Sequence, residues 1–235
     1  MRLKIKNQSG FTLIEVMITM AISGIVLGSV FLVYSNQQKA YLSSDRISEI
    51  QQNLRAAILI ISSETREAGC DPTEKANAGI VSATSTQIRF TRDIAGHALK
   101  PDTQADGDLD DANEDVTFGF SAANDTNSDG IADAGAADLG RDSGGGFQAI
   151  AENIHAIEFS YILDTGTLVS NPSSAQLNQI RAVQVSLLAR ASSIDKDFLN
   201  TQTYTTNSGT VWGPYNDRYK RRFASMTIQC RNLGL

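Results

Sequence analysis

GFTLIEVMITMAISGIVLGSVFLVY, residues 10–34, is a long apolar run whose only charge is Glu15. A helix over residues 11–34 would rise about 36 Å at about 1.5 Å per residue, enough to cross a bilayer core of about 30 Å. Arg2, Lys4 and Lys6 precede it without any acid, and basic residues keep that end of a span cytoplasmic. We therefore predict a membrane-spanning helix over 11–34, with the rest of the chain outside the cytoplasm.

A cleaved secretory signal peptide is the simplest alternative for this stretch. Its apolar core would be about 7 to 15 residues long and would end at a small-residue cleavage site. Here the run is longer, Gly10 stands before it, and Glu15 lies inside it. Because a carboxylate is costly in hydrocarbon, an acid at this position is expected to have a function and a partner.

Residues 35–69 continue the helical pattern with a different surface. No Pro or Gly interrupts residues 35–68, and Gly69 is a suitable C-terminal stop. Apolar residues at spacings of three and four draw one stripe on this part of the helix: Ile47, Ile50, Leu54, Ile58 and Ile61. We predict an amphipathic continuation that packs on a globular head.

The head, residues 70–235, changes to a period of two, which is typical of half-buried antiparallel strands. A turn at residues 171–174 is expected to open a short helix through Gln179, and residues 201–214 form a Thr-, Asn- and Gly-rich loop. The fold class is therefore α+β. The alternating positions are Ile88 and Phe90; Val116, Phe118 and Phe120; Ile157, Phe159, Tyr161 and Leu163; Val183, Val185 and Leu187; Met226, Ile228 and Cys230.

Composition argues against nucleic-acid binding and catalysis. The formal net charge is −6 over 235 residues, which disfavours nucleic acid as a partner of the whole molecule. Only two histidines occur, His97 and His155, and no nucleophile motif or catalytic triad order accompanies them. We predict no enzyme activity. Cys70 and Cys230 fall at the helix end and in the last strand, where an oxidising compartment would favour a disulfide between them.

The N-terminal residues resemble a known processing motif. Gly10-Phe11-Thr12-Leu13-Ile14-Glu15-Val16 is similar to the prepilin motif of type IV pilins and pseudopilins. The resemblance implies that prepilin peptidase removes a leader, residues 1–10, between Gly10 and Phe11 and methylates the new amine of Phe11. Loss of the leader leaves 17 bases against 26 acids, a formal net charge of −9. In assembly, Glu15 would pair with the Phe11 amine of a neighbouring subunit.

Three further stretches resemble the PilW group of minor pilins. They are QNLRAAILIISSETREAGC at residues 52–70, IRAVQVSLLARAS at 180–192 and YKRRFASMTIQCRNL at 219–233. The resemblance implies a type IV pilin-like fold, in which the 11–34 helix forms the membrane anchor and then the filament core. It also implies a role in initiating pilus assembly near the tip. The nearest alternative is a J-type pseudopilin of type II secretion, because the two groups overlap in pattern.

The same resemblance implies partners and a location. Expected partners are other minor pilins, the major pilin, prepilin peptidase and the inner-membrane assembly platform, with a tip adhesin as a further candidate. The chain would cross the inner membrane once, with its head in the periplasm, and reach the pilus or cell surface after assembly.

An acidic, Asp- and Gly-rich insertion, residues 101–146, is the second strong signal. Residues 101–142 hold twelve acids and one base, Arg141. Within it, residues 125–133 place oxygen ligands at positions one, three, five, seven and nine of a calcium loop, with Gly130 at the turn position. These candidate ligands are Asp125, Asn127, Asp129, the carbonyl of Ile131 and Asp133. Ala136 replaces the bidentate Glu of an EF-hand, so the loop is more similar to the Asp-rich loops of dockerins or thrombospondin type 3 repeats, where a second segment completes the shell.

Residues 106–114 form a second candidate metal segment, with Asp106, Asp108, Asp110 and Glu114 as ligands and Asp111 in place of the turn glycine. Hard oxygen ligands without His or Cys favour calcium, although a solvated acidic loop has the same composition. With calcium, the head would also suit a third function, a calcium-dependent adhesion module carried on a pilin stalk.

Overall fold

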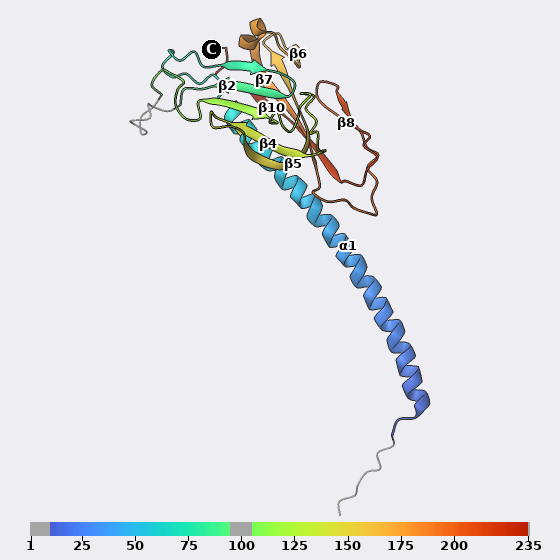
Figure 1. Cartoon of the computed structure of the whole chain (residues 1–235). Coiled ribbons are helices and arrows are strands. Elements are labelled where there is room, and N and C mark those ends of the chain that lie inside the picture. Colours follow the sequence, from blue (N-terminus) through green and yellow to red (C-terminus); the bar gives the residue numbers. More distant parts are fainter. Residues whose placement is uncertain (1–9, 95–104, 235) are drawn as a thin grey trace, which may run out of the picture. The chain divides into compact units, whose positions relative to one another are not determined.

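The computed structural model describes residues 10–94 and 105–234, so most of the leader, residues 1–9, and the start of the insertion lie outside it. The chain divides into two compact units, Met1–Asp45 and Arg46–Leu235. One helix, α1 (Leu13–Thr65), supplies residues to both, and the second unit adds the sheet of the head (Figure 1).

The first unit is an exposed apolar helix. Every residue from Gly10 to Tyr34 is solvent-exposed, including its large side chains. α1 is long and apolar enough in this part to cross a membrane. At its start, the Glu15 N–H donates to Thr12 Oγ1 (3.3 Å), and Thr12 N–H donates to Glu15 Oε2 (2.8 Å). This reciprocal pair is a capping box, which satisfies backbone N–H groups that a helix N-terminus leaves open.

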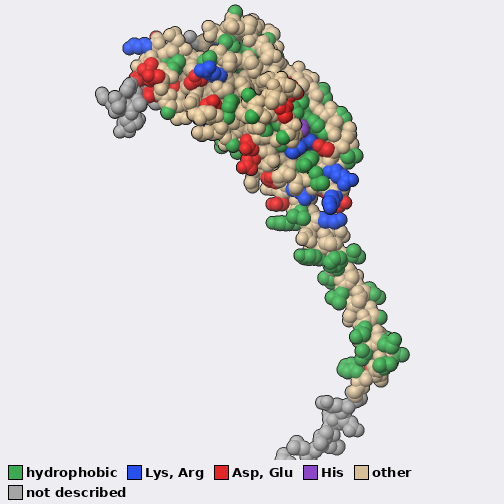
Figure 2. Space-filling view, viewed as in Figure 1, with side chains coloured by type: hydrophobic (Ala, Val, Ile, Leu, Met, Phe, Trp, Pro, Cys, Tyr) green, Lys and Arg blue, Asp and Glu red, His purple; other side chains and the backbone are tan. Residues whose placement is uncertain are grey.

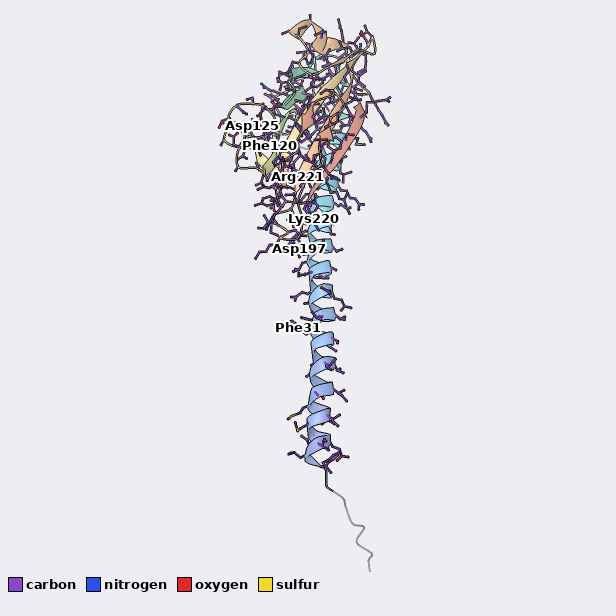
Figure 3. All side chains as sticks on the ribbon, turned by 90° about the vertical axis from the view of Figure 1, so that its right-hand side faces the viewer. Phe31, Phe120, Asp125, Asp197, Lys220 and Arg221 are labelled. Atoms are coloured by element: carbon purple, nitrogen blue, oxygen red, sulfur yellow. The ribbon has the colours of Figure 1, made fainter. Side chains whose placement is uncertain are left out.

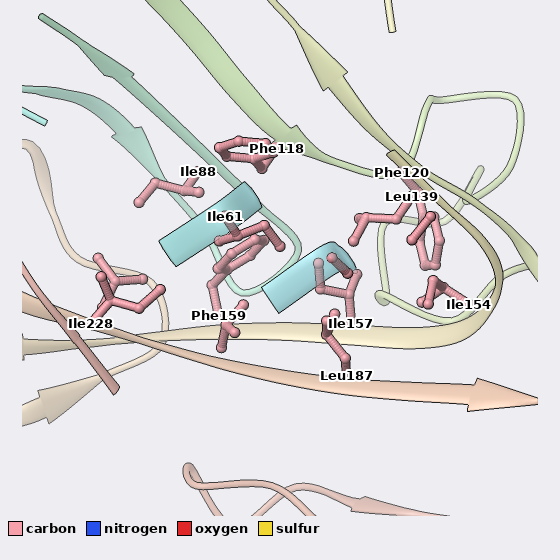
Figure 4. Packing of buried hydrophobic residues seen from close by; sticks show 14 of the residues in the cluster. Ile61, Ile88, Phe118, Phe120, Leu139, Ile154, Ile157, Phe159, Leu187 and Ile228 are labelled. Carbon is pink, nitrogen blue, oxygen red and sulfur yellow. The ribbon is translucent and has the colours of Figure 1, made fainter. Parts of the chain in front are cut away.

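The second unit contains the part of α1 that packs on the sheet. The buried positions Ile50, Leu54, Ala57 and Ile61 recur every three or four residues, as the sequence predicts. Figure 4 shows Ile61 between Phe118 and Phe159 of the sheet. Full burial of one such side chain contributes about 1.5–3 kcal/mol, so this stripe fixes the helix to the head.

The end of α1 lies four residues before Gly69. Gly69 has a φ of +77°, a conformation that favours glycine. A Cβ at this position would lie 2.4 Å from the Leu233 side chain, so the C-terminal segment also excludes a larger residue.

The head is built on one eight-stranded antiparallel sheet (Figure 1). Its order is β1-β2-β3-β4-β5-β7-β10, and β6 pairs with β5 outside this path. Its two longest strands, β5 and β7, are neighbours, and Phe159 of β5 pairs with Val185 of β7. The bounds are β1 (Ile80–Ala83), β2 (Gln87–Thr91), β3 (Asp115–Gly119), β4 (Ala137–Asp142), β5 (Gln148–Leu163), β6 (Leu168–Val169), β7 (Ile180–Arg190) and β10 (Arg221–Gln229).

The predicted strands are confirmed in β2, β3, β5, β7 and β10, and the short helix is η1 (Ser174–Gln179). Two regions differ from the prediction. The acidic segment supplies β4, which the sequence does not predict, in addition to the predicted β3, and both strands belong to the sheet. Residues 201–214 contain a two-stranded sheet of β8 (Tyr204–Thr205) and β9 (Val211–Trp212), in place of a plain loop.

The predicted disulfide is not formed in the structure, where Cys70 and Cys230 are both free cysteines. Their backbones are hydrogen-bonded to different segments of the head. Asp93 N–H donates to the Cys70 carbonyl just beyond β2, and Cys230 N–H donates to the Arg181 carbonyl of β7. Cys230 belongs to the apolar core, and burial raises the pKa of its thiol to about 12. It is therefore a protonated, packed thiol at neutral pH.

Candidate functional site

The processing residues lie on accessible chain. Gly10 and Phe11 are exposed just before α1, and residues 1–9 lie outside the described part. Glu15 is exposed, and its carboxylate accepts hydrogen bonds from both the backbone and the hydroxyl of Thr12. In a single chain this carboxylate therefore caps its own helix. A carboxylate has lone pairs left for a further partner, so capping does not prevent pairing with an amine.

The 125–133 loop is a closed turn attached to the sheet. Its turn residue Gly130 has a φ of +78°, and a Cβ there would lie 2.3 Å from the Ile157 carbonyl oxygen. Ile157 N–H donates to the Gly130 carbonyl, and Ile131 forms an isolated β-bridge with Ala156. The loop is therefore held against β5.

The candidate ligands of this loop bind its own backbone. The Asp125 carboxylate is buried and accepts N–H bonds from Asp129 (3.1 Å) and Gly130 (2.9 Å). Asp129 accepts from Ile131 N–H at 2.7 Å and from the Asn127 side chain at 2.9 Å. These hydrogen bonds stabilise the turn and leave carboxylate lone pairs available to a cation. The same bonds stabilise the loop when no cation is bound.

Asp133 lies apart from this arrangement. Thr126 donates to its carboxylate from both N–H (3.0 Å) and Oγ1 (2.7 Å), and these hydrogen bonds lower the pKa of Asp133. Asp125, Asp129 and Asp133 do not bring oxygens together within 4.8 Å in the described structure. The sequence places the five ligands in one loop, but this conformation does not gather the three acids.

The 106–114 segment does gather acids, with a different membership from the predicted one. Among the described residues, three acidic side chains with oxygens within 4.8 Å of one another occur at Asp106, Asp108 and Asp111. Asp111 Oδ2 is buried and has no hydrogen-bond partner there. Asp110 is exposed, and its N–H donates to Asp108. Glu114 is fully buried and accepts N–H bonds from Ile94 and Asp111, so it acts as a loop support.

Asp93, two residues beyond the end of β2, supports this segment and is absent from the sequence prediction. It is fully buried, and its Oδ2 accepts from Gly107 N–H at 3.1 Å, while its Oδ1 has no partner among the described residues. The sequence could have identified Asp111 as a candidate ligand, because it is an acid in an Asp-rich run. Asp93 carries no such signal, because it stands outside that run and reaches it only through the folding of β2 and β3.

An ion-pair network fixes the base of the same segment. Glu64 of α1 binds Arg141 of β4 (2.9 Å) and Arg92 (3.2 Å), and Arg92 also binds Glu67 (2.5 Å). Both arginines donate to Asn113, one to its carbonyl and one to its side chain. The network therefore connects the end of α1 to the acidic segment.

Of the two histidines, only His155 lies in the described part of the chain, and it is a buried structural residue. It is 5 % exposed, its ring meets Tyr215 edge-on, and its Nδ1 contacts the Gly135 carbonyl. Burial lowers its pKa to about 4, so it is neutral at physiological pH. Within the described part of the chain no nucleophilic side chain is hydrogen-bonded to it, and His97 lies outside that part.

A long N-terminal helix packed on an antiparallel sheet defines a type IV pilin-like protein. A type IV-like pilin from Thermus thermophilus has this fold, with a TM-score of 0.50 and 14% identity over 78% of this chain and 98% of that one. At that identity the likeness concerns the fold alone. No curated protein matches the chain significantly.

Two family matches narrow the class. The prokaryotic N-terminal methylation motif matches residues 5–31, and the type IV pilus-assembly protein W family, PilW, matches residues 137–232. With the fold, they support a PilW-like type IV minor pilin with a role in pilus assembly. These matches point to a structural, non-enzymatic role for the chain.

Proposed function

We propose that this chain initiates pilus assembly near the filament tip, together with other minor pilins and the major pilin. The observation that carries the proposal is the exposed apolar surface of residues 10–34, with Glu15 as its only charge. An apolar surface of this size needs a membrane or neighbouring helices to cover it. The chain would cross the inner membrane with its head in the periplasm, and then move to the pilus.

Replacing Glu15 with Leu tests this assembly role. We expect the variant to be processed and membrane-inserted but at least about tenfold reduced in sheared pili, because a buried amine loses its counter-charge. Asp45→Asn is the matched control, since it removes an exposed acid from the same helix beyond the apolar run. Normal incorporation of Glu15→Leu would contradict the proposal. Loss of protein secretion with intact pili, after deletion of the gene, would favour the type II pseudopilin role.

The head is also proposed to bind calcium. Asp106, Asp108 and Asp111 present only hard oxygen ligands, and three carboxylates this close repel one another without a cation. The partnerless Asp111 Oδ2 fits this donor set. The 125–133 loop is the second proposed site, where cation binding would require Asp133 to move toward Asp125 and Asp129.

A calcium titration of the full chain in detergent micelles tests both sites by heat release and thermal midpoint. Calcium at about 100 times its dissociation constant should stabilise the head by about 2.7 kcal/mol. The double variant Asp108→Asn/Asp111→Asn should abolish calcium binding at the 106–114 segment. The double variant Asp125→Asn/Asp129→Asn should abolish calcium binding at the 125–133 loop. Asp138→Asn, an exposed acid of β4, should change neither. Absence of binding at millimolar calcium would leave a solvated acidic segment and argue against calcium-dependent adhesion.

A further inference from the structure

A half-open pocket of about 290 Å³ lies in the second unit, and its lining includes none of the processing, assembly or acidic residues discussed above. Its wall is formed by helix α1, the loop before β8, and the residues at the start of β10. In Figure 3, Lys220 and Arg221 lie beside the α1 ribbon. The lining residues are Ile47, Ile50, Phe198, Gln202, Lys220, Arg221 and Arg222.

Three consecutive bases give this pocket a positive wall. Lys220 is 3.0 Å from Asp195, and this hydrogen bond lowers the pKa of Asp195. Arg221 binds both oxygens of Asp217 through its Nη atoms, at 2.6 and 2.7 Å. Arg222 is exposed and makes no ion pair with the residues that the structure describes. Its charge is therefore available to a partner.

Arg221 adds an unusual buried donor. Its side chain is 1% exposed, yet its Nε has no hydrogen-bond partner among the described residues. A buried N–H without an acceptor is unfavourable, so an acceptor brought to this residue would be bound with a gain. Arg221 also lines the pocket, so an anionic group bound there would lie near its guanidinium group.

Apolar side chains and Gln202 line the rest of the pocket. Ile50 is buried, Ile47 is half-buried, and the Phe198 ring lies 5.5 Å from Lys220 Nζ. A free inorganic anion would satisfy the bases and leave these apolar side chains wet. A ligand that combines carboxylates with an apolar side chain satisfies both parts of the lining.

The acidic segment of this same chain shows that chemistry. Asp106, Asp108 and Asp110 are exposed around the half-buried Leu109. Figure 2 shows a group of acidic side chains at the upper left of the head and a group of basic side chains at its lower right, with charges of both signs elsewhere on this face. A contact between two different surfaces of successive subunits is heterologous, and such contacts can continue along a filament.

We propose that the pocket binds an acidic peptide segment with a central apolar side chain, presented by a neighbouring subunit. Carboxylates of the segment face Arg222 and Arg221, and its apolar side chain packs on Ile47 and Phe198. The proposal takes the filament role as its setting, but binding can be measured on the isolated chain. Failure of peptide binding is thus separate from failure of assembly.

The probe is a terminally capped, fluorescent peptide of residues 105–114, ADGDLDDANE, added to the full chain in detergent micelles with a calcium chelator. Fluorescence anisotropy should show saturable binding that weakens with salt. Arg222→Glu should weaken binding by about tenfold, since a charge across the interface is reversed. Arg218→Glu, which reverses an exposed base outside the pocket lining, should change it by less than about twofold.

Peptide variants test the proposal without altering the protein. Replacing every Asp of the peptide with Asn should abolish binding, and replacing its Leu with Asn should weaken it several-fold. No saturation at millimolar peptide would overturn the proposal. Equal loss in Arg218→Glu and Arg222→Glu would do the same, because it would show general charge attraction and no use of the pocket.

Discussion

Replacing Glu64 with Ala is expected to lower the free energy of unfolding of the head by about 3 kcal/mol, because it leaves two largely buried guanidinium groups without their shared carboxylate. The side chains of Arg92 and Arg141 are 5% and 15% exposed. Arg92 keeps Glu67, and both keep Asn113, which places the loss at the lower end of the range for breaking buried pairs.

The measurement is urea unfolding of the full chain in micelles, followed by the fluorescence of Trp212. Trp212 is the only tryptophan and is buried in the head, so it reports that unit. Glu67→Ala is the matched control: Glu67 contacts the same Arg92, but its side chain is 53% exposed, and its loss should change stability by about 0–1 kcal/mol. Similar effects from both variants would show that burial does not set the strength of this network.

The sequence predicts the elements whose side chains repeat. α1 was readable because residues 11–34 are uniformly apolar and because Ile47 to Ile61 keep a helical spacing. β5 and β7 were readable from alternating apolar residues. β4 was not, because its sequence ADLGRD has a single large apolar residue, Leu139, and its strand conformation depends on pairing with β3 and β5.

The candidate sites show a similar division. Spacing alone identifies Asp125 to Asp133 as a loop, but the direction of each carboxylate depends on which N–H group it accepts. Asp93 and Glu64 reach the acidic segment across long distances in sequence, Asp93 through Gly107 and Glu64 through Arg92. Contacts of this kind arise from strand pairing and helix packing, so no local pattern records them.

Stability of the head should fall as the pH is lowered from about 6.5 to about 4, because of His155. Burial, with Arg221 and Arg190 nearby, lowers the pKa of His155 to about 4, while the Gly135 carbonyl and Asp217 act in the opposite direction. An unfolded histidine has a pKa of about 6.5. Between these values the unfolded chain binds the proton and the folded chain does not, so acid favours unfolding, by about 3 kcal/mol at pH 4.

His155→Gln separates this effect from the titration of the many acids. Urea unfolding of both proteins is measured at several pH values between 4 and 7.5, and the difference in unfolding free energy is taken at each pH. Carboxylates and His97 cancel in that difference, which leaves the part due to His155. We expect the deficit of the Gln variant, relative to the native chain, to shrink as the pH falls below about 6.5. A pH-independent difference would mean that His155 titrates alike in both states, and that the ring is open to water in the folded head.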